Sequence, residues 1–171
     1  MILNHWPIRI SIVCCMVMLV GCTITEEETI DKGLETYESE LSQQENETNT
    51  EEGQATFYLP PQFEVSETID EYNIVLEHEE QLYVFFHEPN EPQTSTVLLE
   101  RDKLEEQEFL LFEEVTTDEY VSFLMIQEEE EDRLLVAVAL GGAKVSTLST
   151  YETLIDDIEA MTEIVQSYET K

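Results

Sequence analysis

The sequence predicts an α+β domain in which an antiparallel β-sheet, arranged as a meander, is packed by a C-terminal amphipathic helix. From residue 57 onward, short runs rich in β-branched and aromatic residues alternate with turn-like breaks, which is typical of strands. After residue 153 the apolar residues recur in steps of four and three, the period of one helix face. The short breaks between the runs favour antiparallel over parallel pairing.

The first strand pair is predicted in the stretch YNIVLEHEEQLYVFFHE, where two alternating apolar runs flank Glu79 and Glu80. Further strand-like runs are STVLLE, EFLLFEEV, EYVSFLMIQ, RLLVAVAL and AKVSTL. The breaks between them are residues 89–92, Thr117-Asp118, the acidic block 128–132 and Gly141-Gly142. Residues 95–112 also fit a single helix, so the sequence leaves strands and helix open there.

The C-terminal helix is predicted from one stripe of apolar residues. Ser149, with Glu152 three residues later, fits a capping box at its start. The stripe consists of Leu154, Ile158, Met161, Val165 and Tyr168. The stretches FYLPPQFEV and MTEIVQSY are faintly similar to small extracytoplasmic α+β domains of Gram-positive lipoproteins and of anti-sigma regulators, which favours the same fold class.

Alternation in the second strand of the predicted hairpin separates two sets of side chains. Leu82, Val84 and Phe86 share one side, while Tyr83, Phe85 and His87 share the other. Because one helix covers only one side of a sheet, we expect Tyr83 and Phe85 to be left on the uncovered side. They are the predicted binding face, for a protein partner or a small apolar ligand; the alternative is simple core packing.

Residues 1–21 have the features of a secretory signal peptide. Arg9 and the chain amine precede an apolar run of about 11 residues, Ile10–Val20, whereas a membrane span needs about 20. The last two residues of this run and the two after it, Leu19-Val20-Gly21-Cys22, resemble a bacterial lipobox. This resemblance implies cleavage between Gly21 and Cys22, a diacylglyceryl group on the Cys22 thiol, and a lipid-anchored protein on the extracytoplasmic face of the cell membrane. The alternative is an ordinary signal peptide or short signal anchor with an incidental cysteine.

Residues 22–56 are predicted to be the lipidated cysteine and an acidic, disordered tether, and residues 57–171 the folded domain. The tether is rich in Glu and has Lys32 as its single basic residue, so it offers little apolar surface to offset the entropy of ordering. A short amphipathic helix around Ile30, Leu34 and Leu41 is the alternative.

The chain carries 40 acidic against 7 basic side chains, a net charge of -33 at pH 7. This excludes nucleic acid as a partner, because phosphate binding depends on clustered Lys and Arg. A charge this large also predicts a monomer. Adaptation to the environment and recognition of a basic partner both remain open as reasons for the acidity.

No catalytic, cofactor or metal site is predicted. His78 and His87 lie about six residues apart along the hairpin, too far to share a zinc ion, and are predicted to be exposed or at an edge. The run EEEEDR lacks the ligand spacing of a calcium loop, and ALGGAK fits a hairpin turn better than a phosphate loop. We therefore predict a non-enzymatic binding module; the alternative is a small surface hydrolase that uses a pair of carboxylates.

Overall fold

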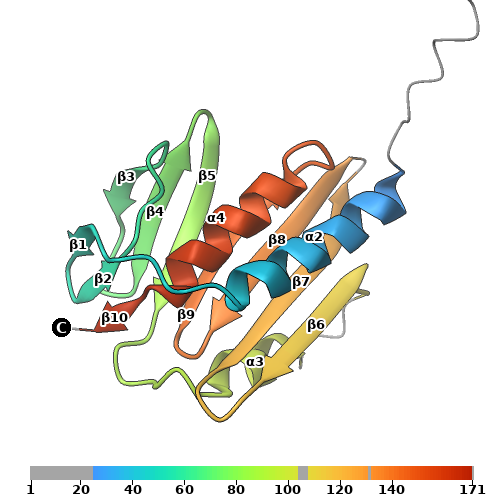
Figure 1. The fold of residues 1–171 in the computed structure, drawn as a ribbon. Coiled ribbons are helices and arrows are strands. Elements are labelled where there is room, and N and C mark those ends of the chain that lie inside the picture. The colour runs from blue at the N-terminus through green and yellow to red at the C-terminus, as the bar shows by residue number, and fades with distance from the viewer. Residues whose placement is uncertain (1–24, 104–107, 131, 171) are drawn as a thin grey trace, which may run out of the picture.

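The computed structural model describes residues 25–103, 108–130 and 132–170. Its main element is a seven-stranded antiparallel sheet with the strand order β3-β4-β5-β9-β8-β7-β6 (Figure 1). The predicted α+β class is confirmed. The strands of this sheet are β3 (Glu64–Thr68), β4 (Asn73–His78), β5 (Gln81–His87), β6 (Leu111–Thr116), β7 (Val121–Glu130), β8 (Arg133–Leu140) and β9 (Ala143–Ser149).

The main sheet consists of two meanders that meet in its middle. β3 to β5 and β6 to β9 each follow one another by adjacent pairing, and β5 joins the two groups by pairing with β9. A small second sheet holds β1 (Thr50–Glu52), β2 (Ala55–Phe57) and β10 (Glu169–Thr170). The chain crosses from β5 to the far edge at β6 through a long connection that contains a short helix, α3 (Val97–Lys103).

Two helices cover one side of the main sheet, and α3 lies on the other side (Figure 1). α2 (Glu26–Leu41) and α4 (Leu154–Gln166) pack against each other and form the larger core with the sheet. Leu98 and Leu99 of α3 form a smaller core with Phe123 and Met125 on the opposite side. The sheet therefore has one side closed by two helices and a second side that α3 covers in part.

The prediction of a disordered tether at residues 22–56 is wrong for most of its length, because residues 26–41 form α2 and residues 50–52 and 55–57 form strands. The alternative of an amphipathic helix is the correct one. Four residues spaced by four, Thr29, Gly33, Tyr37 and Leu41, are buried against the rest of the domain. The apolar stripe is narrow, and the Glu residues on the other side of α2 remain in water.

The start of α2 is fixed by a capping box. The amide of Glu28 donates to Oγ1 of Thr25 at 3.2 Å, and the amide of Thr25 donates to Oε2 of Glu28 at 3.1 Å. Glutamates in the first turn also interact favourably with the helix dipole. At the middle of the helix, a Cβ on Gly33 would lie 2.8 Å from Cδ1 of Ile158. Gly33 thus permits the close approach of α2 to α4.

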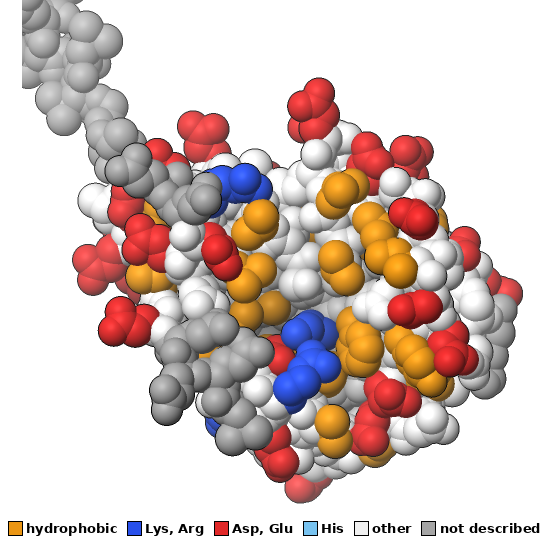
Figure 2. Space-filling view, turned by 180° about the vertical axis from the view of Figure 1, so that it is seen from behind, with side chains coloured by type: hydrophobic (Ala, Val, Ile, Leu, Met, Phe, Trp, Pro, Cys, Tyr) orange, Lys and Arg blue, Asp and Glu red, His pale blue; other side chains and the backbone are white. Residues whose placement is uncertain are grey.

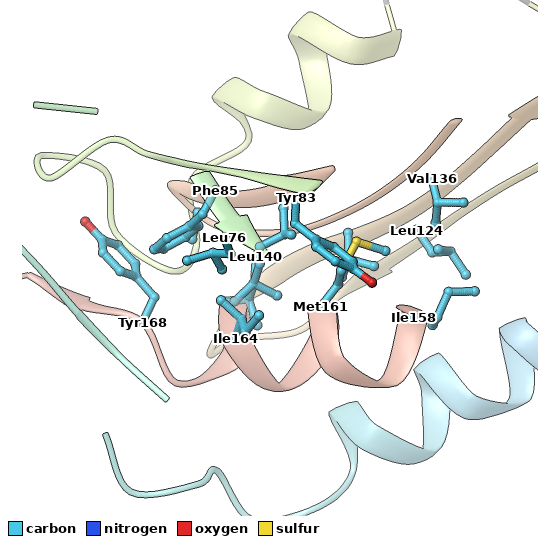
Figure 3. Close-up of a cluster of buried hydrophobic side chains, with 14 of the residues drawn as sticks. Leu76, Tyr83, Phe85, Leu124, Val136, Leu140, Ile158, Met161, Ile164 and Tyr168 are labelled. Atoms are coloured by element: carbon cyan, nitrogen blue, oxygen red, sulfur yellow. The ribbon is translucent and has the colours of Figure 1, made fainter. Parts of the chain in front are cut away.

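The C-terminal helix is confirmed, and its predicted apolar stripe is buried in the larger core (Figure 3). Its predicted capping box is wrong. The N-cap is Thr153, which makes no capping hydrogen bond through its side chain, and Ser149 instead donates to Oδ2 of Asp157 at 2.6 Å. In the ambiguous region 95–112, the run STVLLE contributes to α3 and not to a strand, because Leu98 and Leu99 pack on the sheet from outside.

Both predicted two-residue hairpins are confirmed. His78 pairs with Gln81 across Glu79-Glu80, and Leu140 pairs with Ala143 across Gly141-Gly142. Gly141 has a φ of +55°, and a Cβ there would lie 2.4 Å from the Cα of Gln93. Glycine is therefore required at this position both by backbone conformation and by the loop that packs on the turn.

Candidate functional site

Tyr83 and Phe85, the predicted binding face, are 1% and 0% exposed, so that prediction is wrong. Both point toward α4 in the larger core (Figure 3). The Phe85 ring packs edge-on against Phe57 with centroids 4.9 Å apart, and the hydroxyl of Tyr83 donates to Asp157 at 2.7 Å. The alternation was assigned correctly, but the helix packs on the aromatic side, where burial removes the larger apolar area from water.

The opposite side of β5 is the exposed one. Leu82, Val84 and Leu148 are 55%, 39% and 42% exposed. Leu82 and Leu148 flank the paired residues Tyr83 and Thr147, and Leu148 pairs with Leu135 of β8, so these side chains lie beside one another across three strands. We call Leu82, Val84, Leu135 and Leu148 the sheet patch. Figure 2 views the molecule from this side and shows hydrophobic side chains gathered over the sheet.

The scarce basic residues gather on the same side. The described residues include five Lys and Arg, and all except Lys32 of α2 lie on α3 or on this side of the sheet. Figure 2 shows Lys and Arg side chains next to the hydrophobic ones, and Asp and Glu around the margin and among the hydrophobic side chains on the right of the view. The four are Arg101, Lys103, Arg133 and Lys144. This side is therefore the part of the described surface that departs most from the acidity of the chain.

Asp102 of α3 organises two of these cations. Its carboxylate, which is almost fully buried, accepts from Nζ of Lys144 at 2.9 Å and from Nε of Arg101 at 3.1 Å. The guanidinium carbon of Arg101 lies 5.4 Å from the centre of the Phe86 ring, within cation–π range. At the end of the helix, Lys103 pairs with Glu114 of β6. These contacts hold α3 against the sheet and leave the half-exposed Arg101 side chain at the border of the sheet patch.

The other border of the sheet patch is acidic. Strand pairing places Glu64 opposite Glu77 and Glu67 opposite Val75, and Glu77 in turn pairs with Leu82 of the sheet patch. Directly paired residues point to the same side of a sheet. All three glutamates therefore lie on the same side of the main sheet as the sheet patch, which we call the open side. The open side thus runs from an acidic border on β3 and β4, across the apolar patch, to a basic border on β8 and α3.

A hollow of about 1140 Å³ extends around the ends of β5 and β9 and reaches the start of α4. Its polar centre is Asp157, which accepts from Gln81 at 3.0 Å, Tyr83 at 2.7 Å and Ser149 at 2.6 Å. Burial, followed by the hydrogen bond to Asp157, raises the pKa of Tyr83, so its hydroxyl stays protonated and donates. These three hydrogen bonds to one buried carboxylate tie α4 to β5 and β9, which gives Asp157 a structural role.

The two histidines do not form a site. The predicted register is confirmed, since the amide of His87 donates to the carbonyl of Tyr72 at 2.9 Å. The prediction that both are exposed or at an edge is wrong for His87, which is buried. Its Nδ1 lies 3.2 Å from the hydroxyl of Tyr168, and burial lowers its pKa. His78 is half-buried and stacks on Phe63. Within the described ranges, no group of three or more His, Cys, Asp or Glu is arranged to hold a metal ion.

The lipobox, including the predicted lipidation residue Cys22 and the cleavage residue Gly21, lies outside the described residues. Among the helices of residues 25–103, 108–130 and 132–170, none combines the length and the apolar character needed to cross a bilayer.

The fold and the open side define an acidic α+β domain with one helix-covered sheet face and one partly open face that is apolar at its centre. Comparison with models of known protein families gave no match, and neither did comparison with curated proteins.

Proposed function

We propose that the chain is a lipid-anchored lipoprotein on the extracytoplasmic face of the cell membrane. Its domain is a non-enzymatic binding module, and the partner is a protein that contacts the sheet patch. The anchor is the lipidated thiol of Cys22, as the lipobox implies. The corrected binding face consists of Leu82, Val84 and Leu148 in place of Tyr83 and Phe85.

The observation that carries this proposal is the cluster of exposed leucine and valine side chains on neighbouring strands. Single exposed apolar residues are ordinary on protein surfaces, but a contiguous group with a polar border is typical of an interaction site. Here the group lies at the centre of a sheet side, and Arg101 and Arg133 stand at its border. The combination of an apolar centre, arginine and a charged rim matches the composition of protein interfaces.

The hydrolase alternative is less well supported than binding. It needs two carboxylates in a concave site, one of them free to take up a proton and the other ionised. In the hollow, Asp157 is occupied by three donors. Burial raises the pKa of Glu163, but its carboxylate accepts from Asn46 at 2.9 Å in a contact that joins the segment after α2 to α4. Both acids are thus used to hold elements of the fold together.

The anchor is tested by replacing Cys22 with alanine and fractionating cells. We expect the wild-type chain in the membrane fraction and the Cys22→Ala chain either released or retained as an unprocessed precursor of lower mobility. Cys14→Ala, within the apolar run, serves as the matched control and leaves the distribution unchanged. Firm membrane retention of a processed Cys22→Ala chain would contradict the lipoprotein proposal.

The binding face is tested by photocrosslinking in intact cells. A benzoylphenylalanine residue in place of Val84 is expected to give a discrete protein adduct on irradiation, because that position lies inside the sheet patch. The same residue in place of Glu38, exposed on α2 on the far side of the domain, is the control and is expected to give none. Equal adducts from both positions, or none from position 84, would refute binding through the sheet patch.

A further inference from the structure

We propose that α2 opens from the rest of the domain as one unit, and that three carboxyl groups at its contact with α4 make this opening sensitive to pH, rarer in acid and more frequent in alkali. The three belong to Glu40 of α2 and to Glu159 and Glu163 of α4. This inference concerns the helix-covered side of the sheet, so it is independent of the proposed binding through the sheet patch.

α2 is attached to the domain along a narrow stripe. Among the helices and strands of the described residues, it packs chiefly on α4, and the hydroxyl of Tyr37 also reaches Ser122 of β7. Its buried residues are Thr29, Gly33, Tyr37 and Leu41, and all its other residues are half-buried or exposed. Elements with few buried contacts open locally while the rest of a domain stays folded. We therefore expect α2 to open more often than the strands of the main sheet.

α2 and α4 lie side by side and run in the same direction (Figure 1). Gly33 of α2 approaches Leu154 and Ile158 in the first half of α4. The carbonyl of Gln43, just after α2, accepts from Nε2 of Gln166 at the end of α4 at 3.4 Å. The negative ends of the two helix dipoles are therefore adjacent, and neither helix has a basic residue in its last turn.

Both helices are also acidic. α2 carries seven acidic side chains and one basic one, and α4 carries four acidic side chains and no basic one. Within the part of the chain that the structure describes, no ion pair joins the two helices. Apolar burial between α2 and α4 is thus opposed by repulsion between their carboxylates.

This repulsion acts on the buried part of the contact through Glu40, Glu159 and Glu163. Partial burial raises the pKa of Glu40, and the charge of Glu159 raises it further. Partial burial also raises the pKa of Glu163, and the charges of Glu40 and Glu159 add to that effect. Glu159 and Glu163 are four residues apart on one helix, a spacing at which like charges repel.

The segment after α2 contributes hydrogen-bond donors to the same carboxyl groups. Nε2 of Gln43 donates to Glu40 at 2.6 Å, and Nδ2 of Asn46 donates to Glu163 at 2.9 Å. These hydrogen bonds favour the ionised carboxyl groups and lower both pKa values, but by less than burial raises them. The donors therefore hold the segment over α4 without cancelling the cost of ionisation.

The direction of the pH dependence follows from these shifts. No described Lys, Arg or His acts on the pKa of Glu40 or Glu163, and the charged residues of segment 42–49 are Glu45 and Glu47. Both pKa values lie above the ordinary 4.5 when α2 is docked and return toward it when α2 opens. The docked state therefore binds more protons, so docking is strongest below pH 4.5 and weakens as the pH rises through the docked pKa values.

Opening changes two properties of the domain. It uncovers the part of the larger core on which Tyr37 and Leu41 pack, and it lets residues 26–49 extend to about 80 Å at most. If Cys22 carries the proposed anchor, an open α2 lengthens the reach of the sheet from the membrane.

The test is amide hydrogen exchange of the purified full-length chain, measured by mass spectrometry between about pH 5 and about pH 8. Protection factors, which correct for the intrinsic pH dependence of exchange, are compared between peptides of α2 and of β8. We expect α2 to be less protected than β8 throughout, and its protection to fall roughly two- to fivefold from the acid to the alkaline end, the size of a few partly exposed charge pairs. Sodium chloride at about 1 M, which screens the carboxylates, is expected to reverse most of this fall.

A double variant and a matched control assign the pH dependence to these carboxyl groups. Glu40→Gln with Glu163→Gln removes both charges and keeps an acceptor oxygen on each side chain. This variant is expected to protect α2 in alkali as well as the wild-type chain does in acid. Glu35→Gln with Glu38→Gln removes two charges from the exposed side of α2 and is expected to keep the wild-type pH dependence.

Two kinds of result would overturn the inference. Equal protection of α2 and β8 at every pH would show that α2 does not open separately. A fall in α2 protection that persists in the double variant, or that is lost equally in the control, would show that Glu40 and Glu163 do not set it. Neither result bears on the sheet patch, which the crosslinking at position 84 tests by itself.

Discussion

Replacing Tyr37 with alanine is expected to lower the free energy of unfolding by about 3–5 kcal/mol, the range for deleting a buried aromatic side chain. Tyr37 is fully buried in the larger core, and its hydroxyl donates to Oγ of Ser122 at 2.7 Å. The loss is measured by denaturant unfolding of the purified chain. If residues 22–56 formed a disordered tether, the same substitution would have no measurable effect on stability.

Two further variants show how much of the stability loss comes from the Tyr37 hydroxyl and whether the loss is specific to the buried side of α2. Tyr37→Phe keeps the ring and removes only the hydrogen bond to Ser122, and is expected to cost about 1 kcal/mol. Glu38→Ala changes the exposed neighbour and is expected to stay within about 0.5 kcal/mol. Equal stability of Tyr37→Ala and Glu38→Ala would show that α2 does not pack on the domain.

Replacing Asp157 with alanine is the second change with a large expected effect. It leaves Gln81, Tyr83 and Ser149 without their common acceptor. Each buried donor left unpaired costs about 1–3 kcal/mol, and partial relaxation is expected to keep the total near 3–5 kcal/mol. Denaturant unfolding measures this loss, and fluorescence of the tyrosines reports whether the environment of Tyr83 changes.

The neighbouring carboxylate is the control for Asp157. Asp156→Ala removes an exposed acid from the same turn of α4 and is expected to change stability by less than about 0.5 kcal/mol. Asp157→Asn keeps one acceptor oxygen and is expected to fall between the two alanine variants. A loss from Asp156→Ala equal to that from Asp157→Ala would mean that helix-start charge, and not the buried cluster, stabilises α4.

Local patterns were enough to predict the hairpins and the last helix. The alternation on both sides of Glu79-Glu80 fixed the register of β4 and β5, and Gly141-Gly142 fixed the turn between β8 and β9, because a two-residue turn determines the pairing of its strands. The steps of four and three from Leu154 onward similarly fixed the buried side of α4.

The side of β5 that binds the core was not predictable from its own alternation. Both sides of this strand are apolar, so the pattern alone does not indicate which one the helix covers. The signal that was available lies elsewhere, in α2, where Thr29, Gly33, Tyr37 and Leu41 form a second helical stripe. Two packed helices cover more of a sheet than one, and together they bury the larger aromatic side chains.

The basic border of the open side was also missed by sequence reasoning. Arg101 and Lys144 are far apart in the chain, and the packing of α3 on the sheet brings both to the carboxylate of Asp102, while Arg133 lies at the other end of β8. The one available signal was their scarcity, because most of the few basic residues of this acidic chain fall between positions 101 and 144. Asp102 joins two of them through a contact that no spacing in the sequence indicates.

Side-chain footprinting of intact cells tests most directly whether the sheet patch is a contact surface. A carbene reagent is applied to cells and, in parallel, to the dilute purified chain, and labelling is quantified by mass spectrometry. We expect Leu82, Val84 and Leu148 to be protected several-fold in cells, while Ile69 and Leu110, which are equally exposed outside the patch, are labelled alike in both samples. Equal labelling of all five residues in cells and in solution would contradict the account.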